Sequence, residues 1–258
     1  MNREYLTYYS HELERDMHVL SYTAEQGPKG VPMLVIPSQD GMCDNYENFG
    51  MIDNIADFID AGEVQVFVVD TIDQESWSDR TTHPYNRGLR QEAYYHFLVD
   101  EIVPWIRELN GTGRRLIATG CSLGATHAAI LALRRPDLFE SNISLSGVYD
   151  ATYFTDGYMD STWYDNSPVH FLPRMPEDHP YVEIYNKRSL IFCVGQGAWE
   201  DEGIRTAHIL QDAFRAKNIQ AWVDFWGYDV NHDWPWWRKQ MRYFLPFVLE
   251  HYRRGEKR

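Results

Sequence analysis

The stretch at residues 116–124 constrains this chain more than any other, and it reads Leu-Ile-Ala-Thr-Gly-Cys-Ser-Leu-Gly. Its first four residues predict a short buried strand, and the Ala- and Leu-rich residues 125–135 predict a helix. The motif Gly120-x-Ser122-x-Gly124 fills the sharp turn between them. In this strand–turn–helix context the motif is typical of a nucleophile elbow, which lifts its serine clear of the strand. We therefore predict that Ser122 is a nucleophile, in preference to a chance match in a loop.

The rest of the chain alternates strand-like and helix-like segments, which implies an α/β fold with a mainly parallel central sheet and helices on both faces. We expect one domain across residues 1–258. In such sheets the ligand lies at the carboxyl ends of the strands. Ser122 and the loops after Ile36, Val194 and Trp226 all fall at that edge. The expected strands are 5–13, 17–23, 32–36, 64–69, 116–119, 143–147, 189–194 and 221–226, and the expected helices are 48–61, 91–109, 125–135, 203–217 and 236–253.

Two segments interrupt the alternation. Residues 148–185 are rich in aromatic residues and proline, so we expect an insertion or cap-like segment over the strand ends. Residues 70–90 are polar and irregular, and a loop of that length is usually functional or mobile.

A nucleophilic serine needs a base, and the chain has 10 histidines. His232 follows the last predicted strand, which is where the chain order serine, acid, histidine places the base. A surface histidine before the final helix is the alternative. We predict that His232 takes the proton from Ser122 and returns it to the leaving group.

The acid should follow the strand that ends at Val194, where Glu200, Asp201 and Glu202 stand in succession. Glu200 and Asp201 are the contenders for holding the imidazole in the right tautomer. Aspartate is the commoner acid, so we prefer Asp201 slightly, although it could equally be the N-cap of the next helix.

An oxyanion hole needs two backbone N–H groups. One should come from Leu123, directly after the nucleophile. The other should come from the loop after Ile36, where Gln39 is our first choice, with Ser38 and Asp40 as alternatives. Loss of one such donor costs about 3 kcal/mol of transition-state stabilisation.

Three tryptophans are candidates for contacting substrate: Trp77, Trp199 and Trp234. The Trp-Pro-Trp-Trp run at residues 234–237 serves mainly to anchor the final helix, and Trp234 is its member closest to His232.

The formal charge of −14 argues against nucleic acids and anionic membranes as partners, and we expect a small-molecule ester instead. The three cysteines, Cys43, Cys121 and Cys193, indicate neither a disulfide framework nor a metal site, and we expect no cofactor. The N-terminus has no apolar signal segment and no long apolar run occurs, so we expect a cytoplasmic protein.

Taken together, these pieces resemble the esterase family of α/β-hydrolases that contains esterase D (S-formylglutathione hydrolase), feruloyl esterases, enterochelin esterases and mycolyltransferases. The similarity spans nearly the whole chain. It implies a carboxylic-ester hydrolase with a Ser-Asp/Glu-His triad and no cofactor. The matching pieces are the two early strands around residues 13–16, Gly-Cys-Ser-Leu-Gly at 120–124, Arg-Pro-Asp-Leu-Phe at 135–139, Ser-Gly at 146–147, and Gly-Tyr-Asp at 227–229 ahead of His232.

Three hypotheses follow. The first is a serine esterase that forms an acyl-enzyme on Ser122. The second is an acyltransferase with the same triad, which a dry aromatic pocket would favour. The third is a non-catalytic binding protein of the same fold, which is disfavoured because all three triad members are available.

Overall fold

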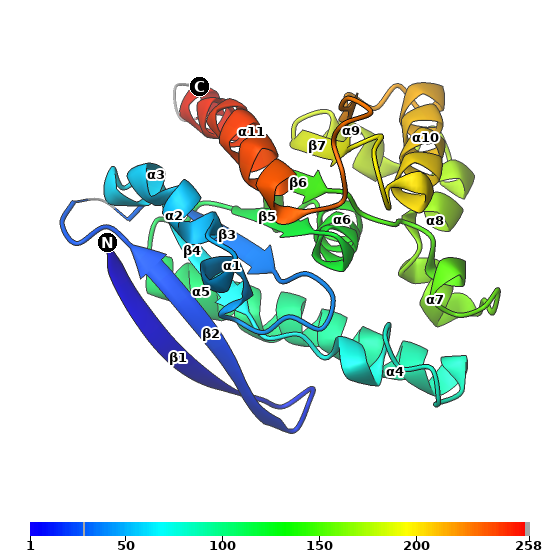
Figure 1. Ribbon diagram of the computed structural model, residues 1–258, viewed down its shortest axis with the longest axis horizontal. Helices are drawn as coiled ribbons and strands as arrows, with labels where there is room; N and C mark the ends of the chain where they lie inside the picture. Colours follow the sequence, from blue (N-terminus) through cyan, green and yellow to red (C-terminus); the bar gives the residue numbers. More distant parts are fainter. Residues whose placement is uncertain (28, 256–258) are drawn as a thin grey trace.

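Eight strands form one sheet at the centre of the computed structural model, which describes residues 1–27 and 29–255 (Figure 1). The sheet order is β1-β2-β4-β3-β5-β6-β7-β8. β1 pairs antiparallel with β2, and β2 with β4, while all pairs from β4 to β8 are parallel. The predicted mainly parallel sheet is confirmed. The strands are β1 (Asn2–Ser10), β2 (Arg15–Thr23), β3 (Val31–Ile36), β4 (Val64–Val69), β5 (Leu116–Cys121), β6 (Phe139–Leu145), β7 (Ser189–Val194) and β8 (Trp222–Phe225).

Both faces of the central strands are apolar, so both must be covered. All six residues of β3 are buried. Leu34 and Ile36 belong to one core cluster, whereas Met33 and Val35 belong to the other, as expected from the alternation of side chains along a strand.

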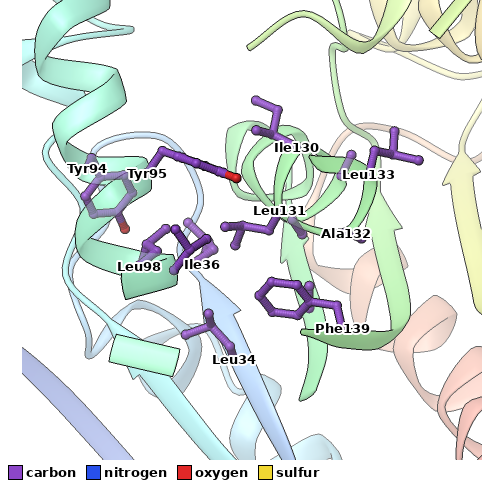
Figure 2. Close-up of a cluster of buried hydrophobic side chains, with 14 of the residues drawn as sticks. Leu34, Ile36, Tyr94, Tyr95, Leu98, Ile130, Leu131, Ala132, Leu133 and Phe139 are labelled. Carbon is purple, nitrogen blue, oxygen red and sulfur yellow. The ribbon is translucent and has the colours of Figure 1, made fainter. Parts of the chain in front are cut away.

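Helices cover each face, as predicted. The first core cluster contains residues of α4, α5, α6, α8, α9 and α10, and the second contains residues of α1, α2, α3 and α11. Figure 2 shows Leu131 of α6 and Leu98 close to Leu34 and Ile36 of β3. In the described part of the chain, no helix is both long enough and apolar enough to cross a membrane. The helices are α1 (Asn45–Asn48), α2 (Met51–Asn54), α3 (Ala56–Asp60), α4 (Pro84–His96), α5 (Val103–Asn110), α6 (Leu123–Arg134), α7 (Ser161–Asp165), α8 (Pro168–Arg174), α9 (Pro180–Tyr185), α10 (Asp201–Ala216) and α11 (Trp234–Gly255), with 3₁₀ turns η1 (Asp73–Glu75) and η3 (Ala151–Tyr153) and a π-helical segment η2 (Phe97–Ile102).

Two helices differ from expectation. The helix expected at residues 48–61 is broken into short pieces: the last residue of α1, then α2 and α3. Gly50 adopts a left-handed conformation (φ +69°) between α1 and α2, and Ile55 departs from helical geometry (φ −116°, ψ 13°) between α2 and α3. The helix expected at 91–109 begins earlier, at Pro84, where the ring nitrogen of His83 accepts a hydrogen bond from the N–H of Tyr85. It continues through η2 into α5. Pro104 lies in the first turn of α5, and because proline has no backbone N–H, it needs no hydrogen-bond partner there.

Residues 148–185 form short elements, η3, α7, α8 and α9. Trp163 in α7 is buried, and its indole N–H donates a 2.7 Å hydrogen bond to the carbonyl of Pro84. The segment is therefore tied to the start of α4. The expectation that it caps the strand ends stays a prediction.

Candidate active site

Ser122 lies in the tight turn between β5 and α6 and has a strained backbone, with φ 56° and ψ −126°. The flanking glycines make that turn possible. A Cβ atom on Gly120 would lie 2.2 Å from the carbonyl carbon of Gly124, and one on Gly124 would lie 2.2 Å from the carbonyl oxygen of Ile36. Strain of this kind persists only where the surrounding structure holds it. The geometry is that of a nucleophile elbow.

His232 lies in the loop between β8 and α11 and reaches back to the elbow. Its Nε2 atom is 2.8 Å from Oγ of Ser122. The backbone N–H of His232 donates a 3.0 Å hydrogen bond to the carbonyl of Ala198, and the imidazole ring packs edge-on against Trp237 with ring centroids 4.9 Å apart. The imidazole is thus held in a position to accept the serine proton.

Glu200 completes the chain of hydrogen bonds. Its Oε2 atom is 3.1 Å from Nδ1 of His232, and its side chain is only 1% exposed. Its Oε1 atom accepts hydrogen bonds from the hydroxyl of Ser146 (2.6 Å) and from the N–H of Gly195 (3.3 Å). Each oxygen of this buried carboxylate therefore has a partner.

This geometry brings Glu200, one of the two contenders for the acid, to His232 and leaves Asp201, the slightly preferred one, apart. Trp199 adopts a left-handed conformation (φ 67°) and α10 begins at Asp201, so Glu200 is buried while Asp201 is exposed. Within the residues that the structure describes, no hydrogen bond joins Asp201 to His232. A carboxylate in the first turn of a helix interacts favourably with the helix dipole, which accounts for Asp201.

The loop after β3 and Leu123 offer backbone N–H groups beside Ser122, and two of these groups are already hydrogen-bonded. The N–H of Ser38 donates to Oδ1 of Asn45 (3.2 Å), and that of Asp40 donates to Oδ2 of Asp73 (3.0 Å). By contrast, no acceptor among residues 1–27 and 29–255 is bonded to the N–H of Gln39 or Leu123, and both residues line the cavity at Ser122. β3 and β5 are neighbours, with Ile36 opposite Gly120, so the loop after β3 starts beside the elbow. Of the three candidates in that loop, only Gln39 has an N–H left to donate.

A cavity of about 240 Å³ opens onto Ser122. Trp199 stands at its rim and is 88% exposed. The lining also includes Tyr153 and Phe154, which the sequence did not single out. The lining residues are Gln39, Ser122, Leu123, Val148, Tyr153, Phe154, Trp199, Asp201, Glu202 and His232.

The other two tryptophans do not line this cavity. Trp77 is fully buried; its indole N–H donates to Oε1 of Gln91 (2.7 Å) and its ring packs edge-on against Phe154. It supports the cavity wall from behind. Trp234 stacks on Phe49 and packs against Trp237, inside the second core cluster. Tertiary packing buries both rings and keeps them out of the lining of the cavity at Ser122.

Sequence reasoning named Ser146 only within the Ser-Gly pair at 146–147 and gave it no role in the site; it follows β6 at the same edge of the sheet. Its backbone is left-handed (φ 58°), and its hydroxyl accepts a 3.0 Å hydrogen bond from the indole N–H of Trp237. Its place directly after a central parallel strand was a signal that could have found it.

Cys121 stands beside the serine but is a poor nucleophile. Burial raises the pKa of its thiol to about 12, even though the nearby hydroxyl of Tyr46 favours the thiolate. At neutral pH it is a protonated thiol, so it does not compete with Ser122 as the candidate nucleophile of the elbow.

Other sites are poorer candidates. A larger cavity of about 530 Å³, lined partly by Arg115 and Glu140, lies at the amino ends of β5 and β6, away from Ser122. In the part of the chain that is described, no three His, Cys, Asp or Glu side chains are grouped so that they could hold a metal ion.

Comparison with known proteins assigns this chain to a family. A family model described as "Putative esterase" matches residues 10–248. A ferulic acid esterase is 17% identical, with a TM-score of 0.75 over 97% of this chain and 98% of that one. The S-formylglutathione hydrolase of Agrobacterium tumefaciens is 15% identical, with a TM-score of 0.74 over 96% and 95% of the two chains. FphF, a fluorophosphonate-binding serine hydrolase of Staphylococcus aureus, is 13% identical, with a TM-score of 0.71 over 96% and 98%.

At these identities the structural matches establish the shared fold, and a search of the curated proteins found no match by sequence. The family model, in contrast, covers most of the chain. The protein is therefore an α/β-hydrolase that belongs to the esterase family.

Proposed function

We propose that this protein hydrolyses carboxylic esters through a triad of Ser122, His232 and Glu200. The observation that carries the proposal is the continuous set of hydrogen bonds from Oγ of Ser122 to Nε2 of His232 (2.8 Å) and from Nδ1 of His232 to Oε2 of Glu200 (3.1 Å). A nucleophile bonded to a base, which is in turn oriented by a carboxylate, is the arrangement that activates serine for attack.

The first half of the reaction acylates the enzyme. Oγ of Ser122 attacks the ester carbonyl carbon while its proton passes to Nε2 of His232. The N–H groups of Gln39 and Leu123 stabilise the negative charge that develops on the carbonyl oxygen. The bond to the alcohol then breaks, and His232 gives its proton to the departing alcohol oxygen.

The second half releases the acid. Water attacks the acyl carbon and passes a proton to His232, the bond to Ser122 breaks, and the serine oxygen regains that proton. Glu200 holds the imidazole in the required tautomer and stabilises the imidazolium in both halves.

Two features of the cavity support hydrolysis of small esters. Its rim is open, since Trp199 is 88% exposed, and water can therefore reach the acyl carbon more easily than in a dry pocket built for acyl transfer. Its volume of about 240 Å³ is below the range of drug-sized ligand pockets, which favours short acyl groups. The cytoplasmic location expected from the sequence stays a prediction.

The test is hydrolysis of p-nitrophenyl acetate, butyrate and octanoate by the wild type and by Ser122→Ala, with labelling by a fluorophosphonate followed by mass spectrometry. We expect activity that is highest on the short esters, a single phosphonate adduct on Ser122, and neither in the variant. A wild type that hydrolyses none of the esters and takes up no label would contradict the proposal. Activity that survives Ser122→Ala would remove Ser122 as nucleophile.

A further inference from the structure

A second buried histidine–carboxylate pair lies beside the triad and takes no part in it. Nε2 of His127 is 3.0 Å from Oδ1 of Asp73, and the two side chains are 2% and 1% exposed. Burying two ionisable groups is expensive, and such pairs are often no more stabilising than apolar residues of the same size. This pair also holds two segments beside the elbow, the loop after β3 and the helix α6.

The carboxylate of Asp73 holds the loop that follows β3. Its Oδ2 atom accepts a 3.0 Å hydrogen bond from the N–H of Asp40, the neighbour of Gln39. The carbonyl of Asp73 accepts from the N–H of Ser78 (2.8 Å), whose hydroxyl accepts from the side-chain amide of Gln39 (2.9 Å). Residues 73–78 thus hold the backbone N–H of Asp40 and the side chain of Gln39.

The imidazole of His127 connects the same carboxylate to the elbow helix. His127 comes four residues after Leu123 in α6, so the two residues lie about one helical turn apart on the same side of the helix. Its ring is fixed edge-on by Trp77 and Tyr94, with centroids 5.8 and 5.4 Å away. The hydroxyl of Tyr94 donates to the carbonyl of Asp70 (2.9 Å).

Other contacts hold the same loop but do not reach α6. Oδ1 of Asp70 accepts from the N–H of Cys43 (2.9 Å), and the hydroxyl of Thr71 donates to the carbonyl of Gly41 (2.8 Å). These bonds fix the far end of the loop against the end of β4. The Asp73–His127 pair differs because it joins the loop to the helix.

We propose that Asp73 and His127 are positioning residues that set the distance between the two oxyanion donors, the N–H groups of Gln39 and Leu123. The inference rests on the proposed function, since it assigns a role within the same site. Each donor must lie about 2.7–3.1 Å from the developing oxyanion to be effective. Asp40 has a left-handed backbone (φ 59°), so without the carboxylate this turn has less to hold it beside the elbow.

The test compares Asp73→Ala with Asp73→Asn. Asp73→Ala removes both contacts, and we expect kcat to fall about 10–100-fold, with KM changed less than about threefold, since the loss of a whole oxyanion donor costs about 100–1,000-fold. In Asp73→Asn, the amide oxygen can accept from Asp40 and the amide N–H can donate to the other tautomer of His127. We expect this variant to retain kcat within about fivefold of the wild type.

Asn110→Ala is the matched control for stability. Asn110 is a buried polar residue before the start of β5, at the opposite edge of the sheet, and its amide donates to the carbonyl of Gly30 (3.0 Å) and to Oε1 of Gln65 (2.9 Å). We expect its Tm to fall as in Asp73→Ala, with kcat unchanged. If Asp73→Ala lowers only Tm and keeps its kcat, the pair is merely structural and the inference is wrong.

Two further measurements keep the test decisive. If Asp73→Ala does not fold, His127→Leu and His127→Gln replace it: kcat should fall in the leucine variant and be largely retained in the glutamine variant, whose amide can still donate to Asp73. Equal kcat values in the two would overturn the inference.

Hydrogen–deuterium exchange of residues 37–44 tests the inference with a measurement that does not require ester hydrolysis. Exchange there should be faster in Asp73→Ala and restored in Asp73→Asn. Unchanged exchange would count against the inference, whereas an inactive and unlabelled wild type would count against the proposed function alone.

Discussion

The hydroxyl of Ser146 donates a 2.6 Å hydrogen bond to Oε1 of Glu200, the carboxylate oxygen that does not contact His232. The same hydroxyl accepts from the indole N–H of Trp237, whose ring packs edge-on against His232. Ser146 and Trp237 therefore support both partners of the histidine–carboxylate contact. This arrangement explains how a glutamate, with a longer and more flexible side chain than aspartate, is held in one orientation.

We expect Ser146→Ala to lower kcat about tenfold, because a hydrogen bond to a charged group contributes about 1.5–3 kcal/mol and only the longer bond from Gly195 would remain on Oε1. The measurement is kcat and KM on a short p-nitrophenyl ester. Ser141→Ala is the control, since Ser141 is a buried serine near the amino end of β6, the strand that Ser146 follows. Equal activity in the two variants would show that Ser146 does not orient Glu200.

The two carboxylates that follow Trp199 should differ sharply. Glu200→Gln keeps the shape but removes the charge that stabilises the imidazolium, so kcat should fall about 100–10,000-fold. Asp201→Asn should stay within about threefold of the wild type, since Asp201 is exposed at the start of α10. A larger loss in Asp201→Asn than in Glu200→Gln, measured under the same conditions, would reverse the assignment.

Gly124→Ala should damage both stability and activity. Its Cβ would lie 2.2 Å from the carbonyl oxygen of Ile36 and 2.3 Å from that of Pro37, which pushes the loop after β3 away from the elbow. Overpacking of this kind costs about 1–3 kcal/mol. Gly255→Ala is the control, since no atom lies within 4 Å of the added Cβ among the described residues. Thermal unfolding and kcat/KM measure the effect, and a Gly124→Ala protein with unchanged Tm would contradict it.

Alanine substitution of Trp199 should affect substrate binding, whereas alanine substitution of Trp77 should affect folding stability. Trp199→Ala should raise KM about 3–10-fold with little change in Tm, because its ring is 88% exposed at the cavity rim. Trp77→Ala should cost about 3–5 kcal/mol of folding free energy, since its ring is fully buried. Steady-state kinetics and denaturant unfolding separate the two effects. An unchanged KM in Trp199→Ala would remove Trp199 from the substrate-binding residues.

Thiol reagents should not inactivate the native enzyme at pH 8. Burial disfavours the thiolate and raises the pKa of Cys121 to about 12, so the thiolate fraction at pH 8 is about 0.0001 and grows only as the pH approaches 12. We expect activity to survive iodoacetamide and to be abolished by a fluorophosphonate. Rapid loss of activity with iodoacetamide at pH 8 would indicate that Cys121 is accessible and reactive.

Much of this architecture could be predicted because its signals are local. The elbow needs glycine on both sides of Ser122. It lies between a strand and a helix, and the residues of each of these elements predict its secondary structure. The chain order of serine, acid and histidine led to His232, which the structure brings to hydrogen-bonding distance of Ser122. The break at Gly50, by contrast, left no clear trace in the apolar pattern of residues 48–61.

The sequence alone predicted the mainly parallel sheet, the edge of the sheet that carries Ser122, and the pairing of Ser122 with His232, because strand patterns and chain order require no knowledge of packing. Only the tertiary structure shows that Glu200, and not Asp201, contacts His232, since neighbouring residues point apart once the chain turns at Trp199 and enters α10. It also decided that Trp77 is buried, and that Asp73 meets His127, 54 residues further along the chain. These outcomes depend on which side chains pack from distant elements, and a pattern read along the chain does not contain that information.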